Sequence, residues 1–127
     1  MKAKTNLTML CDFYELTMGN GYFQTGLADR ICYFDVFYRS VPDKGGFAIA
    51  AGLAQVVEYI QNLCFDEEDI AYLQSKGCFA PEFLDYLRTF RFTGDIWAVP
   101  EGTPIFPGEP ILTVRAPAIQ AQFIETF

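Results

Sequence analysis

A helix with two unlike faces near the N-terminus most constrains how this chain can fold. Residues 12–18 read DFYELTM, and Asp12 precedes Glu15 by three positions, which is the spacing of a capping box. A helix that begins here has one partly polar face, formed by Tyr14, Thr17, Met18 and Gly21. Its second face is more apolar and carries Phe13, Leu16, Asn20 and Phe23. One face can build a core, so the other is left to meet a different surface.

The composition limits the chain to one ordinary globular domain. It has 127 residues, of which 51% are hydrophobic and 17% aromatic, and this is ample material for a core. The aromatic content is high for so short a chain. The aromatic side chains therefore either fill the domain's own core or face another domain or subunit.

Charge and residue types exclude several functions. The formal net charge is −7, so the surface as a whole repels nucleic acid and anionic lipid, although a local basic spot for a phosphorylated small molecule stays possible. The chain contains no histidine, which removes Ser-His and Cys-His nucleophile pairs and histidine metal ligands. No metal site is predicted, and no catalytic residue is assigned within this chain.

The cysteines and the hydropathy indicate a cytoplasmic protein without a membrane segment. The chain has four cysteines, at positions 11, 32, 64 and 78, with no C-x-x-C pair, and all four lie in apolar stretches. We expect buried free thiols in a reducing compartment rather than disulfides or a zinc site. No apolar run approaches the length of a membrane helix, and no signal-type block follows the N-terminus.

The rest of the chain alternates helical and strand patterns. A strand is predicted over 31–39, with Asp35 and Arg39 on the same side and Arg39 at its exit, followed by a turn over 40–46. Strands are also expected over 47–51 and 92–99, and short strands joined by tight turns over 99–117. Helices are expected over 52–62, 67–75 with Asp66 as the cap, 81–90 and 118–127.

The chain ends inside the last helical pattern without a stop signal, and this predicts a fragment of a longer polypeptide. We divide it into an N-terminal α+β domain, residues 1–117, and the start of a following helix, residues 118–127. The glycines match no phosphate-binding loop, and the acidic run 66–69 is better explained as a solvated helix start than as a cation site. Taken alone, Asp12 reads as a cap, Tyr14 as a core or interface residue, and Arg39 as a surface residue.

Five segments, in order, resemble the N-terminal region of nicotinate phosphoribosyltransferases. They are residues 12–18 (DFYELTM), 34–39 (FDVFYR), 46–53 (GFAIAAGL), 101–117 and 124–126 (IET). The resemblance implies the α+β N-terminal domain of type II phosphoribosyltransferases, with a hammerhead or barrel-sandwich part that the proline-rich segment from Val99 would form. In that family an irregular α/β barrel follows, and it is absent from this chain.

The resemblance also implies a reaction. Nicotinate and phosphoribosyl pyrophosphate become nicotinate mononucleotide and pyrophosphate in NAD salvage, with ATP hydrolysis and Mg²⁺ in the full, ligase-type enzyme. By the same resemblance Tyr14 stacks on the pyridine ring, often in the partner subunit's site of a homodimer, and Arg39 approaches phosphate. Asp12 lines the site and Thr17 lies beside Tyr14. The phosphate loop and the magnesium-associated acids belong to the barrel, so we expect the isolated chain to bind no Mg²⁺ or ATP and to be inactive.

Two other functions stay open at this point. The domain could be a non-catalytic oligomerisation or binding module that uses its aromatic surface. It could also belong to a relative that uses nicotinamide or quinolinate, because the residues that distinguish a carboxylate from an amide lie largely outside this chain.

Overall fold

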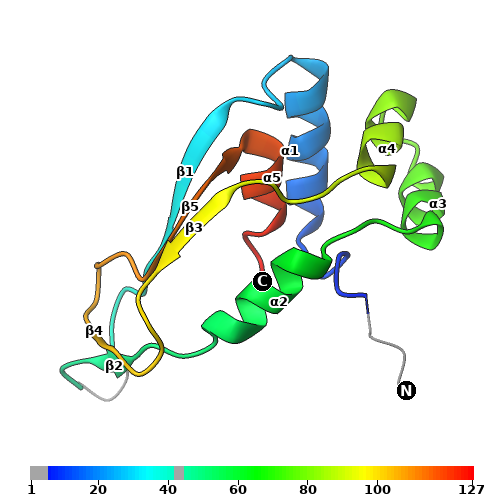
Figure 1. Cartoon of the computed structure of the whole chain (residues 1–127). Coiled ribbons are helices and arrows are strands. Elements are labelled where there is room, and N and C mark those ends of the chain that lie inside the picture. Colours follow the sequence, from blue (N-terminus) through cyan, green and yellow to red (C-terminus); the bar gives the residue numbers. More distant parts are fainter. Residues whose placement is uncertain (1–5, 42–44) are drawn as a thin grey trace, which may run out of the picture.

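A three-stranded antiparallel sheet with helices packed on one face forms the centre of the fold (Figure 1). The computed structural model describes residues 6–41 and 45–127. The sheet has the order β1-β5-β3, formed by Ile31–Val36, Leu112–Pro117 and Asp95–Ala98. Since β5 is last in sequence but central, both outer strands depend on it for their pairing. A second, two-stranded sheet pairs β2 (Ala48–Ile49) with β4 (Pro104–Ile105).

Five helices complete the described fold: α1 (Phe13–Gln24), α2 (Leu53–Asn62), α3 (Glu67–Ser75), α4 (Pro81–Arg88) and α5 (Ala118–Phe123). Helix α5 follows β5 directly and packs against β1, β5 and α1. Figure 1 shows α1 beside α5, with the α3–α4 pair beyond it. The main core lies where these helices meet, and its largest fully buried apolar side chains are Leu16, Ile70, Leu73, Phe83, Leu87 and Ile119.

The sequence patterns predicted most of the helices and strands, but the observed elements are shorter than the predicted ones. The strand expected over 31–39 ends at Val36, because its partner β5 begins only at Leu112, after Pro110. Beyond Val36 the chain leaves the ladder, and the Tyr38 hydroxyl donates to the Ile105 carbonyl at 2.6 Å. The strand expected over 47–51 is reduced to Ala48–Ile49. The predicted turn over 40–46 includes residues 42–44, which lie outside the described residues.

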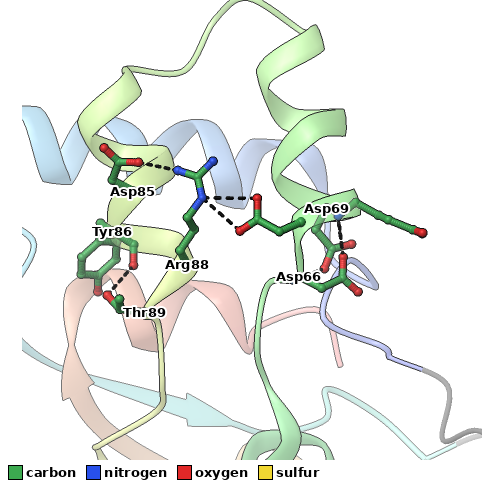
Figure 2. A network of polar contacts seen from close by, with 8 residues as sticks. Asp66, Asp69, Asp85, Tyr86, Arg88 and Thr89 are labelled. Carbon is green, nitrogen blue, oxygen red and sulfur yellow. Dashed lines mark hydrogen bonds and ion pairs between the residues drawn. The ribbon is translucent and has the colours of Figure 1, made fainter.

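The Asp66 cap is confirmed in detail. The Asp66 carboxylate accepts from the amides of Glu68 and Asp69, while the Asp69 side chain accepts from the Asp66 amide, so the pair forms a capping box. The acidic run is therefore a helix start, as expected. Figure 2 shows this cap beside the Arg88 guanidinium, which contacts Asp85 on its own helix and Glu67 of α3 at 3.2 Å. The Arg88–Glu67 ion pair joins α3 to α4.

The helix expected over 118–127 ends at Phe123, with Ile124 as its C-cap. The four residues after Phe123 turn towards α1, where Glu125 and Thr126 find side-chain partners. All six residues of α5 are buried. The division of the chain at residue 117 stays a prediction, but the helix that follows it packs into the core described here.

The cysteines are free, as predicted, but the expectation that they are buried was wrong. Cys11, Cys32 and Cys64 are half-buried, and Cys78 is exposed. The apolar neighbours of Cys78 in sequence, Phe79 and Ala80, turn into the α4 packing, whereas Cys78 itself lies in the connection between α3 and α4. Among the described residues, no helix combines the length and apolar character needed to cross a membrane.

Two glycines of α1 give a matched test of how closely α1 and α5 pack. A Cβ on Gly19 would lie 2.6 Å from the Phe123 ring, whereas a Cβ on Gly21 would meet nothing within 4 Å. Overpacking costs about 1–3 kcal/mol, and alanine gains up to about 1 kcal/mol over glycine in a helix. We therefore expect Gly19→Ala to destabilise by about 1 kcal/mol net and Gly21→Ala to stabilise, as measured by urea unfolding. Equal effects of the two substitutions would contradict this packing.

Candidate functional site

The first turn of α1 lies against the C-terminal segment 124–127, and most of the predicted site residues lie at this junction. Two pairs of side chains join the segments. The Tyr14 hydroxyl donates to Glu125 Oε1 at 2.7 Å, and the Thr126 hydroxyl donates to Glu15 Oε1. The partners in each pair are 111 positions apart in the sequence, so the fold alone brings them together.

Glu15 is the unusual residue of this junction, because its side chain is fully buried. One carboxylate oxygen accepts from Thr126, while the other, Oε2, has no hydrogen-bond partner. Burial raises the pKa of the Glu15 carboxyl, and the nearby carboxylates of Glu125 and Asp12 act in the same direction. The bond from Thr126 opposes this shift but is the smaller effect.

The capping box predicted between Asp12 and Glu15 was wrong. Asp12 does occupy the N-cap position, but its side chain makes no capping hydrogen bond. Its backbone amide donates to the Thr126 hydroxyl at 3.2 Å. The Glu15 side chain is buried and accepts from the Thr126 hydroxyl, but without a bond to the Asp12 carboxylate the reciprocal capping box is not formed. The Asp12 carboxylate is thus exposed and is not used as a cap.

The Tyr14 ring is 45% exposed, which confirms that the first face of α1 is open. Met18 on the same face is 39% exposed, and Thr17 and Gly21 are exposed too. The hydrogen bond to Glu125 is the main reason that the pKa of Tyr14 rises to about 12. The structure thus presents an uncharged aromatic ring that is held at its hydroxyl end and open to solvent.

Thr17 lies one turn beyond Tyr14, and its hydroxyl donates to the Tyr14 carbonyl at 3.0 Å. This bond is local to the helix and satisfies the hydroxyl. The structure therefore brings Asp12, Tyr14 and Thr17 together on the exposed side of one helix start. What each of them binds stays a prediction.

Arg39 is placed elsewhere. It lies three residues beyond β1 and is exposed, and within 6–41 and 45–127 it forms no hydrogen bond or ion pair. It makes no contact of these kinds with Tyr14. The described part of the chain therefore does not unite its guanidinium group with the α1 residues in one site.

A mostly apolar groove of about 660 Å³ opens between α2, the strands β1 and β5, and the C-terminal segment. Glu125 lines this groove, whereas Tyr14 and Arg39 do not. The groove and the exposed Tyr14 ring are therefore different surfaces. No described group of three or more His, Cys, Asp or Glu side chains could hold a metal ion, so Mg²⁺ has no fitting site among these residues, and we derive no step through it.

The sequence patterns predict no role for Gln122, Glu125 or Thr126. Glu125 and Thr126 fell within a segment that was singled out, but no periodicity or spacing pairs them with α1. The one available signal was polar: four polar residues interrupt the apolar segment from Ala118 to Phe127, namely Gln120, Gln122, Glu125 and Thr126. Such interruptions mark side chains that need partners.

Comparison with known proteins shows which class this fold belongs to. Residues 9–127 match the model of the nicotinate phosphoribosyltransferase N-terminal domain. The chain therefore belongs to the nicotinate phosphoribosyltransferase family and contains its mixed α+β N-terminal domain.

Individual relatives agree with this assignment. Nicotinate phosphoribosyltransferase pncB2 of Mycobacterium tuberculosis is 45% identical over 119 residues, which cover 94% of this chain and 26% of the relative. The Bacillus subtilis nicotinate phosphoribosyltransferase is 36% identical over 121 residues, or 95% of this chain and 25% of the relative. The crystal structure of human nicotinic acid phosphoribosyltransferase superposes with a TM-score of 0.83 at 35% identity and covers 91% of this chain and 24% of that one. The chain thus spans about a quarter of the length of these relatives.

The buried carboxyl of Glu15 predicts a specific dependence of stability on pH. Because its pKa is raised in the folded state, its contribution to stability is fully present below the pKa of the unfolded chain and is lost as pH rises through the folded pKa. Glu15→Gln removes this loss and keeps an acceptor for Thr126. We expect the substituted protein to gain stability relative to the original as pH rises from 4 towards 8, measured by urea unfolding at each pH.

The matched control is Glu109→Gln, which changes an exposed carboxylate in a turn. This control should leave the pH dependence of unfolding unaltered. If Glu15→Gln and Glu109→Gln followed the same pH profile, Glu15 would not be the buried titrating group described here.

Proposed function

We propose that this chain supplies the N-terminal part of an enzyme that converts nicotinate and phosphoribosyl pyrophosphate to nicotinate mononucleotide and pyrophosphate, with ATP hydrolysis, in NAD salvage. Membership of the family and the names of the relatives support nicotinate over nicotinamide or quinolinate. One observation carries the role of this particular segment: Tyr14 presents a half-exposed, neutral ring whose hydroxyl is already engaged.

The ring suits a pyridine substrate. A stacked aromatic pair needs one flat face open to the ligand and a ring that is fixed in place, and the first turn of α1 offers both. Because the Tyr14 hydroxyl bonds to Glu125, the ring contributes its face and not a donor to the substrate. Asp12 and Thr17 flank it at the edge of the site, as the resemblance implies.

Arg39 is proposed to hold phosphate oxygens of phosphoribosyl pyrophosphate. Its planar fork fits two oxygens at once, and no described carboxylate competes for it. The chemistry at the anomeric carbon depends on positioning and on stabilisation of developing charge. The groups that would hold Mg²⁺ and ATP belong, on this proposal, to the three quarters of the relatives that this chain does not span.

The proposal also covers the activity of the isolated chain, the oligomeric state of the complete protein and its compartment. The 127-residue chain by itself is inactive on this proposal, because it spans only about a quarter of the length of the relatives that it matches. The complete protein is a homodimer whose sites are shared, with the open face of α1 directed at the partner. The protein works in the reducing cytoplasm, where its free cysteines stay reduced.

The test is the formation of nicotinate mononucleotide by the complete gene product with Tyr14→Ala and Arg39→Ala. Tyr14→Ala should lower kcat/KM for nicotinate by about tenfold or more, because the ligand loses its stacking partner. Arg39→Ala should raise KM for phosphoribosyl pyrophosphate by a similar factor, and Arg39→Lys should recover only part of it, since lysine keeps the charge but not the fork.

Tyr72→Ala is the matched control, because Tyr72 is also a half-exposed helical tyrosine but lies on α3. This change should leave both KM values close to those of the unaltered protein. Activity within about threefold of the unaltered protein for both Tyr14→Ala and Arg39→Ala would overturn the assignment of these residues.

A further inference from the structure

The Tyr14 ring is held from its hydroxyl end by a chain of hydrogen bonds that starts in the core. Gln122, which is only 2% exposed, lies in α5 and donates from Nε2 to Glu125 Oε2 at 2.6 Å. The other carboxylate oxygen of Glu125 accepts from the Tyr14 hydroxyl at 2.7 Å. A buried amide thus fixes an exposed carboxylate, and the carboxylate fixes the phenol.

The backbone on both sides of Glu125 is restrained as well. The Glu125 amide donates to the Gln122 carbonyl at 3.3 Å. The next residue, Thr126, bonds to Glu15 and to the Asp12 amide. Phe127 then stacks on Tyr59 of α2, with ring centroids 4.1 Å apart and planes 5° from parallel. Glu125 therefore has little freedom to follow the tyrosine, and the position of the carboxylate determines that of the ring.

We propose that Glu125 is a positioning residue for nicotinate binding: it holds the Tyr14 ring in the orientation in which the pyridine stacks on it. This inference rests on the function proposed for Tyr14. A tyrosine ring anchored only through Cβ samples several rotamers, and immobilising a free side chain on ligand binding lowers affinity by about two- to tenfold. The hydrogen bond to Glu125 restricts the ring before the ligand arrives.

The ring and the hydroxyl of Tyr14 have different roles on this proposal, and Tyr14→Ala removes both together. The ring would bind the substrate, and the hydroxyl would serve only the bond to Glu125. Tyr14→Phe should therefore have the same effect as Glu125→Ala. It should also be much milder than Tyr14→Ala.

The experiment is a double-mutant cycle in the complete gene product with Tyr14→Phe, Glu125→Ala and the two combined. Each single change should raise KM for nicotinate about fivefold, and the double change should raise it no further, because both remove one interaction. The kcat and the KM for phosphoribosyl pyrophosphate should stay within about twofold of the original. Glu125→Gln, which keeps an acceptor oxygen, should restore most of the loss, and Glu109→Ala is the control for the loss of an exposed carboxylate.

A second readout does not depend on turnover. In protein labelled with ¹³C at the tyrosine ζ carbon, the pKa of the Tyr14 phenol should fall from about 12 towards that of an ordinary tyrosine when Glu125 is replaced by alanine. A change of fold alone would not move this phenol selectively among the seven tyrosines. If Glu125→Ala does not fold, Tyr14→Phe and Glu125→Gln still decide the question by the same KM comparison.

The outcomes distinguish the two proposals. Independent, multiplicative effects of Tyr14→Phe and Glu125→Ala, or an unchanged phenol pKa, would overturn the role of Glu125 while leaving Tyr14 as the stacking residue. An unchanged KM for nicotinate in Tyr14→Ala, or no nicotinate mononucleotide from the unaltered protein, would overturn the proposed function itself.

Discussion

The hydrogen bond between the buried Glu15 of α1 and Thr126 is the interaction on which the rest of this structure depends. A carboxyl group with one unpartnered oxygen in a protein interior is costly unless it is protonated and hydrogen-bonded. This unfavourable burial occurs where α1 contacts the C-terminal segment 124–127. Because Thr126 also accepts from the Asp12 amide, the same hydroxyl satisfies the helix start that Asp12 itself leaves uncapped.

This junction connects the sheet to the helical half of the core. Helix α5 continues directly from the central strand β5, and α1 packs on α5 along its length. On its other side α1 contacts α4, which Arg88 ties to α3. Helices α5 and α1 therefore lie in turn between the sheet and the α3–α4 pair, and the first turn of α1 is held by the C-terminal segment. The exposed face of α1 is not packed against the core and is therefore open to a ligand or another subunit.

Local patterns in the sequence predicted those features that depend on local physics. The division of α1 into two faces, the cap at Asp66 and the proline start of α4 follow from spacing within one turn of helix. The Asp12–Glu15 capping box was wrong because the Asp12 side chain makes no cap bond, and the bond of Glu15 to Thr126, 111 residues away, could not be predicted from the local pattern. The strand over 31–39 was predicted too long for a related reason: its length is set by where β5 begins after Pro110.

The residues of the candidate site also divide into those that local patterns predict and those that depend on distant partners. The open face with Tyr14 could be predicted from helical periodicity, and the exposure of Arg39 from its position after a strand, whereas a phosphate role for Arg39 came only from the resemblance. The role of Glu125 could not, because a glutamate near the end of a short helix has no pattern of its own. The family and its N-terminal domain are established by the comparisons, whereas the stacking role of Tyr14 is a proposal that rests on its exposed, hydrogen-bonded ring.

The central claim is that the Thr126 hydroxyl holds the start of α1, and amide hydrogen exchange in Thr126→Val tests it most directly. Valine keeps the shape of threonine and removes only the hydroxyl. The account predicts that the Asp12 amide and the first turn of α1 exchange faster, while amides of α3 and α4 keep their protection. Unchanged exchange at Asp12, or an equal loss of protection in all helices, would contradict it.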